Sequence, residues 1–210
     1  GMVSRKSALK RMRQRQSKAV KILHASGIRN PLRLVHVIRN SIDSLSLDLR
    51  GISVLTEAAS GPFVVSPIIA AMAGAREVVA LTQDSKYASA AAVIEQTRAL
   101  EILCGVEEGK IQINVNHDPA LFTNVDVVTN LGFVRPINSI AIKHMKPGAV
   151  IALMCEAWEY REGDLDLDMC RRHGISVYGT NEDFRGLEVF AYSGWVAIQL
   201  LLEAQIELHK

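Results

Sequence analysis

The chain has 210 residues, of which 49% are hydrophobic and 22% are charged, and its formal net charge is +2. This length and composition are typical of a globular protein with one substantial core, and they exclude a disordered tail. No apolar run reaches the roughly 18 residues that a membrane span needs, so we expect no membrane segment. The three cysteines fit neither a zinc site nor a disulfide framework, which predicts no metal site and a reducing, cytoplasmic location.

The charge is distributed unevenly along the chain. Residues 1–42 contain 11 Lys or Arg and no Asp or Glu, whereas the remainder has 13 basic and 22 acidic residues. A basic arm of this kind can bind nucleic acid or an anionic surface, or it can lie on its own body or on a partner subunit. Leu9, Met12, Val20 and Leu23 recur at helical spacing and form an apolar stripe, so the sequence favours docking on the protein itself over nucleic acid.

Helices and strands alternate after a second expected helix at residues 31–44. Strands are expected at residues 52–57, 77–83, 111–116, 125–130, 149–154 and 175–180, with helices near 62–74, 87–104, 135–145 and 165–173. The strands are short, rich in β-branched residues and without strict alternation, as in a parallel sheet covered on both faces. The fold class predicted is therefore α/β, a doubly wound, mainly parallel Rossmann-like sheet of about six strands.

We expect the chain to have two parts. Residues 1–45 form a basic helical extension, and residues 46–210 form the nucleotide-binding domain that contains the sheet. The domain ends in a long helix near residues 187–208 that is apolar on nearly every side. Such a helix must be buried all round, so we expect it to meet the N-terminal helices or a second subunit, which favours a homodimer.

The turn after the first strand is the predicted cofactor site. In a doubly wound sheet this turn holds a nucleotide cofactor, and an acid beyond the second strand meets the ribose. The expected cofactor contacts are Glu57, Ser60, Gly61, Pro62, Phe63, Asp84 and Ser85. Only Gly61 remains of the usual glycine set, and Glu57 would repel a phosphate. Asp84 would favour NAD over NADP, and it is equally placed to cap the following helix, a compatible role.

Residues 52–182 resemble the NAD-binding domain of D-2-hydroxyacid dehydrogenases and of S-adenosylhomocysteine hydrolase. The resemblance lies in DLRG at residues 48–51, VTNLG at residues 128–132 and HMKPGAVI at residues 144–151. It implies that Asn130, Leu131 and Gly132 lie against the nicotinamide. The family's own catalytic Arg, Glu and His have no counterparts that can be matched here, and we expect the roughly fifty N-terminal residues to be too few to replace its separate substrate domain.

An oxidoreductase acting on a small carboxylated substrate is the leading interpretation. Arg135 would emerge beside the reacting end of the cofactor and hold a substrate carboxylate, or it forms a structural salt bridge. The carboxylate of Glu156 or Glu182 would accept the proton.

Two other classes of function stay open. The segment EAASG at residues 57–61 is similar to the acid-x-Gly-x-Gly turn of Rossmann-like methyltransferases. S-adenosylmethionine is cationic at sulfur and carries no phosphate, so Glu57 would not be a liability for it. The third class is a non-catalytic nucleotide-sensing module whose basic arm contacts nucleic acid or another protein. All three imply a small-molecule ligand.

Overall fold

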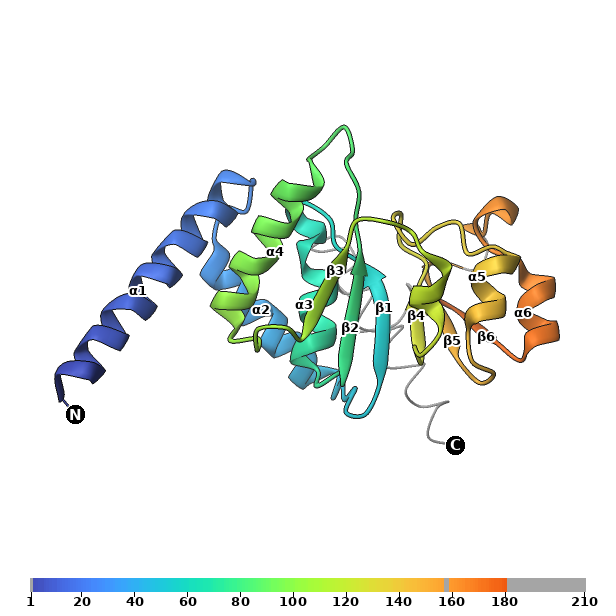
Figure 1. Ribbon diagram of the computed structural model, residues 1–210, viewed down its shortest axis with the longest axis horizontal. Coiled ribbons are helices and arrows are strands. Elements are labelled where there is room, and N and C mark those ends of the chain that lie inside the picture. The colour runs from blue at the N-terminus through green and yellow to red at the C-terminus, as the bar shows by residue number, and fades with distance from the viewer. Residues whose placement is uncertain (1, 157–158, 181–210) are drawn as a thin grey trace.

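The computed structural model describes residues 2–156 and 159–180, and Figure 1 shows their arrangement. The helical elements are α1 (Met2–Ala25), α2 (Pro31–Ser44), η1 (Gly61–Val64), α3 (Val65–Met72), α4 (Ala90–Cys104), η2 (Pro119–Phe122), α5 (Ser139–His144), η4 (Glu162–Asp164) and α6 (Leu167–His173). The strands are β1 (Ser53–Glu57), β2 (Glu77–Leu81), β3 (Ile111–Asn114), β4 (Val127–Thr129), β5 (Val150–Glu156) and β6 (Ser176–Thr180).

The six strands form one sheet in the order β3-β2-β1-β4-β5-β6, and all neighbouring pairs are parallel. Val54 in the middle of β1 pairs with Val78 of β2 on one side and with Val127 of β4 on the other. The chain thus winds outward from β1 in one direction, returns to its other side and winds outward again. This confirms the predicted doubly wound α/β fold.

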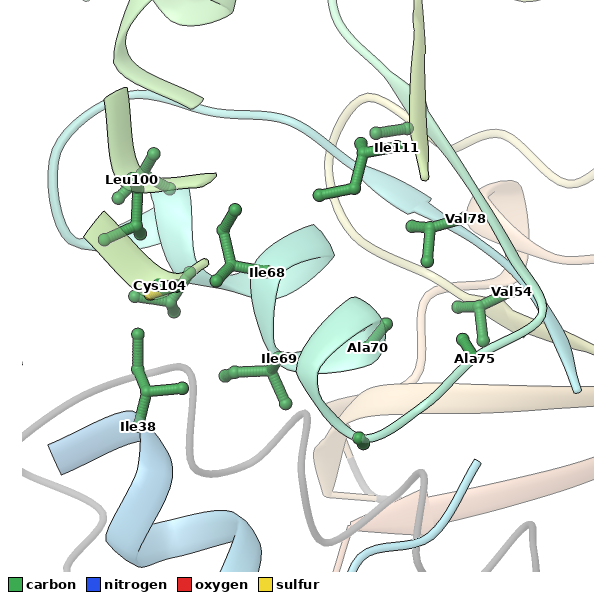
Figure 2. Close-up of a cluster of buried hydrophobic side chains, with 14 of the residues drawn as sticks. Ile38, Val54, Ile68, Ile69, Ala70, Ala75, Val78, Leu100, Cys104 and Ile111 are labelled. Carbon is green, nitrogen blue, oxygen red and sulfur yellow. The ribbon is translucent and has the colours of Figure 1, made fainter. Parts of the chain in front are cut away.

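Successive residues of the central strands point to opposite faces of the sheet, and each face has its own core. Val54 belongs to the cluster under α2, α3 and α4, whereas Leu55 belongs to the cluster under α5 and α6. Figure 2 shows the first cluster, where Ile38 of α2 lies next to Cys104 of α4 and Ile69 of α3. Burial on both faces explains why the strands read as continuous apolar runs.

Helices α4 and α5 begin three and four residues later than the sequence predicts. Helix α4 begins at Ala90 because residues 84–89 form a loop closed by its own side chains. Helix α5 begins at Ser139, where Asn138 caps it through the N–H groups of Ile140 and Ala141. The expected apolar helix at residues 187–208 lies outside the described residues, and the domain boundary near residue 45 stays a prediction.

The basic helix α1 packs on the body only through its second half. Ala19 and Leu23 are buried, but every residue from Ser4 to Lys18 is exposed. Leu9 and Met12 retain 51% and 50% of their accessible surface. The apolar stripe therefore docks on the described body at one end only, and in Figure 1 the first half of α1 projects away from the sheet. No helix in the part of the chain that the structure describes is long and apolar enough to cross a membrane.

Candidate functional site

The strand order reverses between β1 and β4, which is where doubly wound sheets bind their ligands, at the carboxyl ends of the strands. Below this point the two strands are joined by a buried hydrogen bond between the hydroxyls of Thr56 and Thr129, 2.8 Å apart. Above it, β1 leads into the turn before η1 and β4 leads into the loop before α5. The two connections form the walls of the candidate site.

Glu57 links these two walls. It ends β1, is 6% exposed, and its carboxylate accepts a hydrogen bond of 3.0 Å from the backbone N–H of Phe133 in the β4–α5 loop. Burial raises the pKa of Glu57, while the Phe133 N–H and the nearby Arg135 guanidinium oppose that shift. The net environment therefore disfavours the ionised carboxylate, as is common for carboxyl groups that exchange protons.

Arg135 lies on the other side of the same loop. A Cβ built on Gly132 would lie 3.6 Å from a carboxylate oxygen of Glu57 and 3.7 Å from a guanidinium nitrogen of Arg135, so the glycine separates the two charges. The guanidinium also forms a salt bridge of 3.1 Å with Asp164 of η4. Both of the roles expected for Arg135 are therefore compatible, since its side chain keeps 35% of its accessible surface beyond this pairing.

A small cavity of about 90 Å³ adjoins this arginine. Its lining consists of polar and charged side chains around one leucine: Asn130, Arg135, Glu159, Tyr160, Arg161, Asp164 and Leu165. At about 30 Å³ per water molecule, the volume holds roughly three waters or one carboxylate group. Tyr160 and Leu165 also line a broader depression of about 830 Å³ at the start of α5 and α6. A ligand could thus place an acidic group by Arg135 and its remainder in the depression.

The turn after β1 leaves a helix start without a capping side chain. No side chain caps η1 at Ser60 or α3 at Val64. In contrast, side chains of Asn30, Ser89, Asn138 and Asp166 cap α2, α4, α5 and α6, respectively. Gly61 has φ +63°, the left-handed region that glycine enters without strain. Pro62 and Phe63 are exposed beside it, and Phe63 keeps 47% of its surface.

The residues beyond β2 are used mainly to shape a loop. The carboxylate of Asp84 accepts a hydrogen bond of 2.8 Å from the Ala90 N–H at the start of α4, so the capping role is present. The hydroxyl of Ser85 accepts from the N–H groups of Tyr87 and Ala88. Asp84 remains exposed, and one of its carboxylate oxygens has no hydrogen bond to a described residue. A contact with a ribose is compatible with this arrangement.

In the segment expected at the nicotinamide, residues 130–132, one side chain is hydrogen-bonded within the sheet. Asn130 is 8% exposed, and its side-chain oxygen accepts a hydrogen bond of 2.6 Å from the Met154 N–H of β5. The Leu131 carbonyl accepts from the N–H of Arg135 in a tight turn, which leaves Gly132 at the exposed tip. Glu156 ends β5 at the same edge of the sheet, and its role as proton acceptor stays a prediction. Glu182 lies outside the described residues.

Three residues outside the predicted site belong to this region. Asp164 pairs with Arg135, and Tyr160 donates a hydrogen bond to the Leu165 carbonyl, which fixes the chain segment over the cavity. Thr82, directly after β2, is 3% exposed and its hydroxyl has no hydrogen-bond partner among the described residues. Neither spacing nor composition signals Asp164 as a site residue, because its partner Arg135 lies on another loop.

The comparisons with known proteins find likeness in structure alone. No protein-family model and no curated protein matches the sequence. Among solved structures, similar ones include shikimate 5-dehydrogenase from Listeria monocytogenes in complex with shikimate and NAD, with 12% identity over 79% of this chain and 56% of that chain and a TM-score of 0.47. A putative alcohol dehydrogenase from Thermotoga maritima has 13% identity over 80% of this chain and 41% of that chain, with a TM-score of 0.45.

A third similar structure is shikimate dehydrogenase from Aquifex aeolicus, with 15% identity over 86% of this chain and 61% of that chain and a TM-score of 0.42. The chain therefore spans about half the length of the structures that it resembles. All three are dehydrogenases, but none is a D-2-hydroxyacid dehydrogenase or an S-adenosylhomocysteine hydrolase. The finer resemblance to those two families stays a prediction from the sequence.

Proposed function

We propose that the protein binds NAD at the carboxyl edge of its sheet and acts as an oxidoreductase on a small carboxylated substrate. The observation that carries this proposal is the uncapped start of η1 and α3 at the switch point between β1 and β4. A helix start there presents a positive dipole end and the backbone N–H groups of Gly61 and Phe63, although Pro62 between them has none, and such groups bind a pyrophosphate. At the starts of α4, α5 and α6 the backbone N–H groups already bond to the capping side chains of Ser89, Asn138 and Asp166.

The residues present fit a dinucleotide in three respects. Gly61 lets the backbone approach a phosphate closely, the exposed carboxylate of Asp84 can accept from ribose hydroxyls, and Thr82 offers a buried hydroxyl that lacks a partner in the described chain. Glu57 is the carboxylate beside the phosphate-binding turn, and its interactions with the Phe133 N–H and Arg135 direct it toward the β4 loop. The donor set is thus sufficient, with a weaker phosphate cradle than a full glycine turn supplies.

When bound, NAD would supply the hydride acceptor, and the chain's own side chains would orient the substrate. Arg135 would hold a substrate carboxylate in the small cavity, with Asp164 fixing the guanidinium from behind. Such charge-assisted pairing in a small enclosed volume restrains the substrate in a single orientation. Glu156, at the end of β5, or Glu182 would accept the substrate proton, as the sequence reasoning expects.

Thermal unfolding with NAD, NADP, S-adenosylmethionine or S-adenosylhomocysteine tests the proposal. A ligand at a hundred times its dissociation constant stabilises by about 2.7 kcal/mol, which for this chain length shifts Tm by roughly 5–10 °C. A shift with NAD that exceeds the shift with NADP is expected. No shift with either dinucleotide would refute NAD binding.

An S-adenosylmethionine site is the second candidate, and the position of Glu57 is the observation that favours it. A carboxylate at the end of β1 suits a ligand with an ammonium group and a sulfonium, whereas it disfavours a pyrophosphate. The variant Glu57→Gln separates the two, because glutamine keeps an oxygen for the Phe133 N–H. NAD binding should tighten in this variant, while S-adenosylmethionine binding should weaken.

A further inference from the structure

Helix α1 carries a concentration of positive charge that the proposed oxidoreductase function does not use. Between Met2 and Ala25 it has eight Lys or Arg side chains and no Asp or Glu: Arg5, Lys6, Lys10, Arg11, Arg13, Arg15, Lys18 and Lys21. An ordinary solvated helix mixes both signs, because oppositely charged side chains at i and i+4 stabilise it. An acid-free helix gives up that stabilisation over 24 residues.

These charges are exposed to solvent, and none of them forms an ion pair within the described part of the chain. All eight basic residues are exposed or partly exposed, and none takes part in the five salt bridges found among the described residues. The only side-chain hydrogen bond that a basic residue of α1 makes with a described residue joins Arg11 to Ser7 on the same helix. Arg11 and Arg15 line a groove that also has Glu101 and Glu108 on its wall. Lys6, Lys10 and Arg13 instead line a surface formed by α1 residues, on the half of the helix that projects from the body in Figure 1.

The distribution of the basic residues argues against a membrane surface as the partner. A helix that lies in a membrane interface separates a broad apolar face from a polar one. On α1, Arg15 lies one turn from Met12, and Arg5 lies two turns from it on the same side. The half-exposed apolar side chains are therefore surrounded by cations, which is incompatible with burying that face in acyl chains.

The α1 helix of a second copy is also a poorer match for α1. In a symmetric contact of α1 with itself, two acid-free helices repel one another. A polyanion carries no such cost, since each cation that meets a phosphate releases counterions from the polyanion. The charge pattern of α1 is complementary to a regular row of phosphates.

We propose that α1 binds duplex DNA, without dependence on its sequence. Lys6, Lys10 and Arg13 recur at i, i+4 and i+7 on one face of the helix, and they line one shallow surface. From Lys6 to Lys21 the helix extends about 22 Å, at 1.5 Å per residue. The major groove of B-DNA, about 12 Å wide, admits a helix of this diameter, while the narrow major groove of duplex RNA does not.

The test measures binding of the full-length chain to a fluorescently labelled 20-base-pair DNA duplex at several salt concentrations. The variant carries Lys6→Gln, Lys10→Gln and Arg13→Gln, which are exposed positions where glutamine keeps helix propensity. The matched control carries Lys143→Gln, Arg171→Gln and Arg172→Gln, three exposed basic residues on α5 and α6 at the other end of the molecule. Thermal unfolding of both variants verifies that each is folded.

The wild-type affinity should fall steeply with salt, and the α1 variant should have a shallower dependence by about 2.7 in the slope of log K against log salt. At 0.1 M salt this corresponds to a loss of about 10²–10³-fold in affinity, while the control keeps the wild-type affinity. Equal losses in variant and control would overturn the proposal, because the binding would then report net charge alone. So would undetectable duplex binding at low salt, or dissociation of a wild-type oligomer by the α1 substitutions without any effect on DNA.

Discussion

Replacing Glu57 by alanine and by glutamine tests whether this residue serves as a hydrogen-bond acceptor or as a buried charge. Alanine removes the acceptor of the part-buried Phe133 N–H, and an N–H left unpaired inside the protein costs about 1–3 kcal/mol. In a chain of this length 1 kcal/mol corresponds to about 2–4 °C in Tm, so we expect Glu57→Ala to lower Tm by roughly 2–12 °C. Glutamine retains the acceptor and removes the charge that burial disfavours, so at pH 7 it should equal or exceed the wild type.

The pH dependence follows from the raised pKa of Glu57. Because the folded-state pKa lies above the ordinary value of 4.5, the contribution of this group to stability is fully present below 4.5 and is lost as the pH rises through the folded-state pKa. The stability of the wild type relative to Glu57→Gln should therefore increase as the pH falls from 7 toward 4.5. Denaturant unfolding of both proteins across this range measures the difference.

Two results would refute this reasoning about Glu57. If Glu57→Gln at pH 7 loses as much stability as Glu57→Ala, the attraction of the carboxylate to Arg135 outweighs the cost of its burial. If the difference between wild type and Glu57→Gln does not change with pH, the carboxyl group has the same pKa in the folded and unfolded chains.

Three further predictions concern buried or capping groups. Burial raises the pKa of the Cys104 thiol to about 12 and that of Cys170 to about 11, so mass spectrometry at pH 8 should find both thiols unmodified by iodoacetamide until the chain unfolds. Thr56→Val and Thr129→Val should each cost about 1–2 kcal/mol by denaturant unfolding, and the double variant should cost less than their sum, since it leaves no hydroxyl unpaired. Asp84→Ala should cost about 1 kcal/mol by loss of its bond to the α4 start, whereas Asp84→Asn should preserve stability and reduce the preference for NAD over NADP.

The sheet could be predicted from the sequence because each strand is a short apolar run between clear turns. Strand β1 begins one residue later than expected and ends at the predicted Glu57, and α2 has the predicted bounds. A strand covered on both faces contains few polar residues beyond paired ones such as Thr56 and Thr129, so its limits are visible from the sequence. The start of α5 could not be located in this way, because Pro136, two residues before the cap at Asn138, suits the first turn of a helix equally well.

The candidate site could be predicted only in outline. The topology places Glu57, Arg135 and Asn130 at one edge of the sheet, as expected for carboxyl ends of parallel strands. The partners of these side chains could not be predicted, because Phe133 N–H, Asp164 and Met154 N–H reach them from loops and strands far along the chain or across the sheet. Hydrogen bonds of this kind leave no periodic signal in the sequence.

The pairing of β1 has a consequence for the nascent chain. Strand β1 is synthesised first of all the described strands, yet its partner β4 lies 73 residues further along, at Val54 and Val127. At 5–20 residues per second, the ribosome adds that length in roughly 4–15 s, during which one side of β1 has no partner. An unpaired apolar strand is a template for intermolecular pairing, so fragments that end before β4 should aggregate, and synthesis in the cell depends on shielding of this strand until β4 emerges.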